Sequence, residues 1–362
     1  MRGIIFVLAI ASFASVAPAQ ATKPAGDAWP LYKHAAAHIS EGDRKGISSP
    51  ASSTLSYQGF PPFPAEWHGL EKESFAYNAP ALALTRKAMA MNAARWPTTD
   101  GARYLNACRG IANEIADAAL YQHLQGDDAE AIEYVRDELH LADLLNSGPT
   151  DPVIEYLVAA GVRASALNRL EVITTQVAIT SDAGDHNRLQ ADAAKALVRR
   201  LFTNDDPAAR LQKLLGHKNE AELKPEQKEA FRTHLRRVQM ERNLAAMSLA
   251  CHLFRFEKSR WPASLDDLKA YLPAAPVDAW GPMGYVLVKG GLPDGADRPL
   301  VYSRCNSKDG LFYRVDSPQY GFYPGDGSGR HADQQKEGGQ FRDVALWAPP
   351  AAKPEPTTRP LK

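Results

Sequence analysis

The feature that most constrains the fold is a long amphipathic segment in the C-terminal half of the chain. From Pro225 to Lys258, apolar residues recur at spacings of three and four, which predicts one helix of about thirty-four residues and roughly 50 Å. Proline fixes its own φ and disfavours the α region for the preceding residue, so Trp261-Pro262 should end this helix. Ser264 is placed to cap a short second helix. The pattern predicts the architecture of this region and indicates no catalytic or binding activity.

After Pro276 the pattern changes to short runs of β-branched and aromatic residues separated by Gly, Asp and Pro. The runs are 285–288, 300–303, 311–315 and 344–347. We expect them to form a small antiparallel sheet packed on the long helix. The tail, 349–362, has almost no large apolar residue to bury, and we expect it to be disordered.

The N-terminus has the pattern of an export signal. Arg2 is followed by an apolar run, 3–16, and by Ala17-Pro18-Ala19, which fits the small-x-small rule of signal peptidase. The run is shorter than the roughly twenty residues that cross a bilayer as a helix, and no later segment approaches that length. We therefore expect an exported bacterial protein, periplasmic or extracellular, with no membrane span in the mature chain. An uncleaved N-terminal anchor is the alternative.

The rest of the chain is predominantly helical. Residues 78–201 are rich in Ala and Leu, with turn residues at intervals that give helices of ordinary length, and Asp127 and Thr150 are expected N-caps. We expect a mainly α protein with a C-terminal α+β domain. Its expected segments are a signal peptide (1–19), a helix and a Ser/Gly/Pro-rich strap (20–77), a helical bundle or short solenoid (78–222), the α+β domain (223–348) and the tail (349–362).

Charge and cysteine content exclude several classes of function. Lys plus Arg equals Asp plus Glu at 42 each, so no overall field favours nucleic acid or anionic lipid. Cys108, Cys251 and Cys305 are too few and too far apart for a disulfide framework or a clustered zinc site. Export would permit one bridge, Cys108–Cys251, but we favour three buried thiols.

The long helix is followed, in order, by Arg260-Trp261-Pro262, Pro276-Val277-Asp278-Ala279-Trp280-Gly281, Tyr302-Ser303 and Asp343-Val344. This order resembles the C-terminal half of the major pseudopilin of type II secretion, over about a third of the chain. The resemblance implies a pseudopilin-like domain with a long helix on a small antiparallel sheet. Pseudopilins begin with a prepilin-peptidase site and a glutamate five residues after its glycine, whereas Leu8 stands five after Gly3 here. Filament assembly is therefore not expected.

The same resemblance points to calcium, because the acidic loop after the pseudopilin sheet binds that ion. The matching residues here are Asp309, Asp326 and Asp343. Hard cations need six to eight oxygen ligands, and the loop also contains Arg330, His331 and Lys336. We expect a solvated loop, with calcium as the alternative, and no other cofactor.

Two other pairs of residues resemble metal or catalytic sites but have simpler explanations. His34 and His38 lie one helical turn apart but lack the glutamate and third ligand of a zinc enzyme, so we interpret them as surface or packing residues. Cys251 and His252 are sequence neighbours on a helix and point about 100° apart, which favours a core cysteine. No catalytic residue is assigned.

These observations favour an exported, non-enzymatic protein that acts through contacts with an unidentified protein of the cell envelope. The alternative is a secreted hydrolase or carbohydrate-acting protein that uses carboxylates such as Asp266, Asp309 or Asp343.

Overall fold

Helices dominate the part of the chain that the structure describes. The computed structural model describes residues 26–49, 66–91, 93–97, 101–146, 152–174, 176–203, 225–278, 281–288, 297–305 and 342–345. Its α-helices are α1 (Trp29–Arg44), α2 (Trp67–Met89), α3 (Gly101–Gln125), α4 (Asp128–Leu145), α5 (Pro152–Thr174), α6 (Ala191–Leu201) and α8 (Pro225–Lys258). The expectation of a mainly α protein is confirmed.

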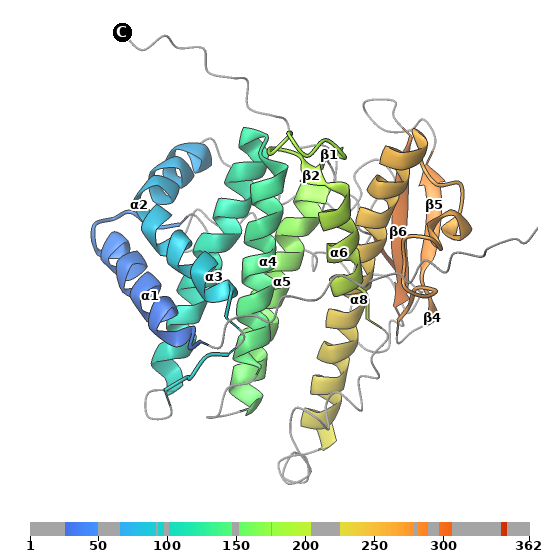
Figure 1. Cartoon of the computed structure of the whole chain (residues 1–362). Helices are drawn as coiled ribbons and strands as arrows, with labels where there is room; N and C mark the ends of the chain where they lie inside the picture. Colours follow the sequence, from blue (N-terminus) through green and yellow to red (C-terminus); the bar gives the residue numbers. More distant parts are fainter. Residues whose placement is uncertain are drawn as a thin grey trace, which may run out of the picture.

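The first five helices pack side by side as a bundle, in which α3 contacts α1, α2, α4 and α5 (Figure 1). Apolar residues at helical spacing are buried on two of these helices: Ile111 and Ile115 of α3 and Ile132 and Val135 of α4 are at most 1% exposed. Asp127 caps α4, since its side chain accepts a hydrogen bond from the Glu130 N–H at 2.9 Å. That cap was predicted; the predicted cap of α5, Thr150, lies outside the described residues.

Helix α2 begins at Trp67, whereas we expected the helical region to begin at residue 78. After the buried Trp67, the inward face of its first turns is polar, because Glu71 and Ser74 are both fully buried. A search for apolar periodicity therefore misses these turns.

A short parallel pair of strands, β1 (Ile179–Thr180) and β2 (Leu189–Gln190), lies between α5 and α6. We expected only an antiparallel sheet, and no strand in this segment. Two-residue strands are too short to show an alternating pattern, so no sequence signal marks them.

Helix α8 has the bounds predicted from the sequence and packs against α5, α6 and the strands that follow it. Leu244, Met247 and Cys251 on its buried side are inaccessible to solvent. Strands β5 (Gly284–Val288), β6 (Arg298–Cys305) and β7 (Arg342–Ala345) form an antiparallel sheet with β6 in the centre. Figure 1 shows β5 and β6 on the side of α8 away from the bundle. A second antiparallel pair, β3 (Val277–Asp278) and β4 (Gly281–Pro282), also follows α8.

The end of α8 differs in one detail from the expectation. The helix ends at Lys258, and Ser259 takes a left-handed conformation with φ of 54° before Trp261-Pro262. Ser264 precedes the 3-10 helix Leu265–Leu268 but makes no capping hydrogen bond through its side chain. Asp267 stabilises this turn instead, because its carboxylate accepts a hydrogen bond from the Ala263 N–H at 2.7 Å.

Two of the three cysteines can be placed. Cys108 and Cys251 are both free and buried, so the bridge considered between them is not formed, and the side chain of Cys305 lies outside the described part of the chain. Burial raises the pKa of both thiols well above the ordinary value. Among the described helices, none has the length and apolar content needed to cross a membrane.

Candidate functional site

The residues singled out from the sequence do not come together in a site. Asp309 and Asp326 lie outside the described residues, and Asp343 lies in β7, in register with Arg304 of β6. Asp266 is exposed and pairs with Lys269 at 2.8 Å. Within the described ranges, no group of three or more His, Cys, Asp or Glu residues is arranged to hold a metal ion.

The two histidines of α1 do not converge either. His34 is exposed, whereas the ring of His38 stacks on Tyr77 of α2 at 4.8 Å and its Nε2 lies 3.0 Å from the Tyr77 carbonyl oxygen. His38 thus helps to pack α1 on α2.

The structure instead has a pocket of about 370 Å³ at the turn between α3 and α4. Its wall is formed by the end of α3, the start of α4 and the segment containing β1 and β2. The lining residues are His123, Gly126, Asp128, Gln176, Ala178, Asp185, Asn187 and Arg188. Gly126 has a φ of 88°, which glycine adopts without strain, and this lets α3 turn sharply into α4. The volume suits a small ligand, and the lining side chains are mostly polar.

A histidine and an aspartate form the buried part of this pocket. The Nδ1 atom of His123 lies 2.5 Å from Asp128 Oδ1, and both side chains are at most 6% exposed. The other oxygen of Asp128 accepts a hydrogen bond from the Ala178 N–H at 2.6 Å. The carboxylate is therefore fixed on both sides, and it orients the imidazole by accepting the Nδ1 proton. None of the described residues is hydrogen-bonded to Nε2, so this nitrogen remains available to a molecule in the pocket.

The opposite wall is held by its own backbone contacts. Asp185 accepts hydrogen bonds from the N–H groups of Asn187 and Arg188, each at 3.3 Å, and Arg188 Nε lies 3.4 Å from its second oxygen. The Asn187 carbonyl accepts a hydrogen bond from the Ala129 N–H at the start of α4. The wall is thereby tied to α4, and its charges are balanced within the turn. This arrangement suits a small polar ligand more than a strongly charged one.

A second polar group lies inside the bundle, away from the turn. Asp117 of α3 accepts hydrogen bonds from Ser49 Oγ at 2.7 Å and from Arg169 of α5 at 3.0 Å. Ser74 of α2 donates to Glu114 of α3 at 3.0 Å. Glu71 of α2 and Glu138 of α4 are also fully buried. We call Glu71, Glu114, Asp117, Glu138 and Arg169 the carboxyl network.

Burial raises the pKa values of this network. The pKa of Glu114 is raised to about 7 mainly by burial, although hydrogen bonds from Ser74 and Asn78 oppose the rise. The pKa of Glu138 is raised to about 8 by burial, against the effects of Ser165 and Arg169. Burial also raises the pKa of Glu71 well above the ordinary value, and the nearby charges of Asp117 and Glu114 add to the effect.

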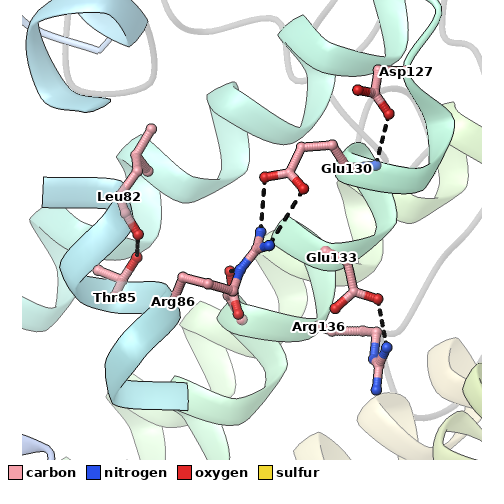
Figure 2. Close-up of polar contacts among 8 residues, drawn as sticks. Leu82, Thr85, Arg86, Asp127, Glu130, Glu133 and Arg136 are labelled. Atoms are coloured by element: carbon pink, nitrogen blue, oxygen red, sulfur yellow. Dashed lines mark hydrogen bonds and ion pairs between the residues drawn. The ribbon is translucent and has the colours of Figure 1, made fainter. Parts of the chain in front are cut away.

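A surface clamp ties α2 to α4 beside this network. Figure 2 shows Arg86 of α2 reaching across to Glu130, whose backbone N–H is held by the Asp127 cap. The Arg86 guanidinium lies 3.1 Å from Glu130 and 2.5 Å from Asp137. Burial raises the pKa of Asp137 to about 6 even though Arg86 favours its charged form. The clamp is a structural contact between α2 and α4, and none of its residues lines the pocket.

Sequence reasoning missed the His123–Asp128 pair. The segment from Leu120 to Ala131 contains the signal that could have found it: a histidine at the end of one helix and an acidic residue just after a Gly126-Asp127 turn. Such a turn brings the two ends together. Comparison with protein families, with curated proteins and with solved structures finds no match to this chain.

Proposed function

We propose that this protein is a non-enzymatic binding protein whose helical bundle holds a small polar molecule in the pocket beside His123. The observation that carries the proposal is the fixed imidazole: Asp128 engages Nδ1, and Nε2 has no partner among the described residues. An oriented imidazole nitrogen inside a polar pocket is a strong donor or acceptor for a ligand.

Nuclear magnetic resonance with labelled histidine tests this proposal directly. A panel of small polar probes, including inorganic phosphate, acetate, glycine and glucose, would be titrated into the full chain. We expect at least one probe to shift the His123 ring signals, and the shift to disappear in Asp128→Asn, which loses the orienting carboxylate. His186→Ala is the matched control, because His186 is exposed beside the pocket and does not line it. Probe shifts that persist in Asp128→Asn would place binding elsewhere.

A second candidate function is hydrolysis, and the same pair favours it. A histidine oriented by a buried carboxylate has the arrangement of a general base that activates water. This differs from the carboxylate mechanism considered from the sequence, because Asp266 is exposed and paired with Lys269. Turnover of ester or glycoside probes that falls at least about 100-fold in His123→Ala would favour hydrolysis over simple binding.

The envelope role expected from the sequence also remains a proposal. The succession of the long helix α8 and an antiparallel sheet that contacts it supports a pseudopilin-like domain that meets a protein partner after export. Crosslinking of the exported chain in envelope extracts should recover one specific partner. If deletion of β5–β7 leaves that crosslink intact, the contact does not involve this domain.

A further inference from the structure

The carboxyl network has more acceptors than its described donors supply. Carboxylate oxygens only accept hydrogen bonds, whereas a neutral carboxylic acid also donates one. Both oxygens of Glu71 are buried and have no hydrogen-bond partner among the described residues. The Oδ1 of Asn78, about two turns further along α2, is a second buried acceptor without a partner among the described residues. Protons on the carboxyl groups would supply the missing donors.

The balance of charges in the network also indicates that some of its carboxyl groups are protonated. Four carboxyl groups of the network face one guanidinium, that of Arg169, which pairs with Asp117 at 3.0 Å. A buried charge that lacks a partner is costly, and such a group normally becomes neutral instead. Asp117 is the member best placed to stay ionised, which leaves the other three carboxyl groups to hold protons.

Among the described residues, Arg169 is the only cation whose charge acts on Glu71 or Glu138, and none is found to act on Glu114. Glu71 faces Glu114, Asp117 and Tyr121 of α3 and Arg169 of α5. Glu114 faces Asp43 of α1 in addition to Ser74 and Asn78 of α2, and Glu138 faces Ser165, Arg169 and Asp117. The other described cation between α2 and α4, Arg86, is engaged by Glu130 and Asp137.

We propose that the carboxyl network is a proton-dependent latch: Glu71 and Glu138 are held as neutral acids in the closed bundle, and their ionisation loosens the packing of α2 and α4 on α3 and α5. Each group releases one proton to solvent as the latch opens. The proposal is independent of the pocket, because it requires no ligand.

The sign of the pH effect follows from linkage. These carboxyl groups have higher pKa values in the folded chain than in the unfolded chain, so the folded state binds more protons above about pH 4.5. Their contribution to stability is complete below about pH 4.5 and is lost progressively as the pH rises from there to about 7 for Glu114 and about 8 for Glu138. Within this window, each carboxyl group that is protonated only in the folded state makes the folding equilibrium constant fall by up to about tenfold per pH unit.

Urea unfolding of the full chain between pH 5.5 and 8.5 tests the latch. We expect the wild-type folding equilibrium constant to fall steeply as the pH rises. In Glu138→Gln this fall should be smaller by up to about tenfold per pH unit, because the amide is always neutral. Glu71→Gln should act in the same direction. Glu73→Gln is the matched control, since Glu73 is exposed on the same helix and should leave the slope unchanged.

A second measurement covers the case in which a variant fails to fold. The infrared spectrum of the wild-type chain at pH 6 should contain the band of protonated carboxyl groups, and the band should weaken at pH 8.5. Its absence at pH 6, or a slope that is unchanged in both glutamine variants, would overturn the proposal. It would also be overturned if Ca²⁺ flattened the wild-type profile, a chelator restored it and Glu71→Gln removed the effect, because the network would then be a cation site.

Discussion

The helical bundle and the unit formed by α8 and its strands bury polar side chains in opposite ways. In the α8 unit, both ends of the Asn243 amide are hydrogen-bonded: Oδ1 accepts from the Thr203 N–H at 2.9 Å, and Nδ2 donates to the carbonyls of Thr203 at 2.9 Å and Val277 at 3.0 Å. In the bundle, Glu71 and the Oδ1 of Asn78 lack such partners among the described residues. A satisfied polar group fixes one arrangement, whereas an unsatisfied one makes stability depend on protons or ligands.

The two regions also end their helices differently. In the bundle, left-handed backbone falls on Gly46 after α1 and on Gly126 after α3. After α8 it falls on Ser259, where a side chain makes that conformation less favourable. The bundle therefore has unstrained turns and several buried carboxyl oxygens without partners, whereas the α8 unit has the well-bonded Asn243 and a mildly strained turn.

The largest effect is expected on removing the charge of Asp117, the carboxyl group of the bundle that pairs with Arg169. Asp117→Asn should destabilise the protein by about 3 to 5 kcal/mol at pH 7, because it leaves Arg169 buried without its anionic partner. Chemical denaturation measures this loss. Asp266→Asn is the control, because its pair with Lys269 is exposed and should contribute little. Equal effects in the two variants would contradict a specific role for the buried pair.

A second test addresses the satisfied side of the comparison. Asn243→Ala should destabilise the protein by about 2 to 4 kcal/mol, because it removes two buried hydrogen bonds to the chain after α6 and a part-buried one to β3. Asn78→Ala should cost less, since one half of that amide has no partner to lose. If thermal melts rank the two variants in the reverse order, the contrast between the two interiors is wrong.

The smallest expected effect is at the turn after α8. Ser259→Gly should stabilise the protein by up to about 1 kcal/mol, because glycine adopts a φ of 54° without the cost imposed by a Cβ atom. Ser264→Gly serves as the control: Ser264 has extended backbone with a φ of −156°, so glycine there brings no such gain. A loss of stability in Ser259→Gly would indicate that the serine side chain makes a contact that outweighs the strain.

Local chemistry made part of the fold predictable. The bounds of α8 follow from apolar spacing between Pro225 and Lys258, and the Asp127 cap follows from its place before a helical pattern. Helix α2 was placed too late, because its inward residues, Glu71 and Ser74, have the appearance of a solvated face. The His123–Asp128 pair was not predicted, since neither residue type at that spacing is unusual in a helix–turn–helix connection.

The sequence by itself determined that the chain is mainly helical and where its long C-terminal helix begins and ends, because backbone preferences and apolar periodicity act over a few residues. Only the tertiary structure decided which polar faces turn inward. Glu71, Glu114 and Glu138 come from three different helices, and their pKa values depend on burial that no single segment can create. The pocket beside His123 likewise exists only because the β1–β2 segment closes over the α3–α4 turn.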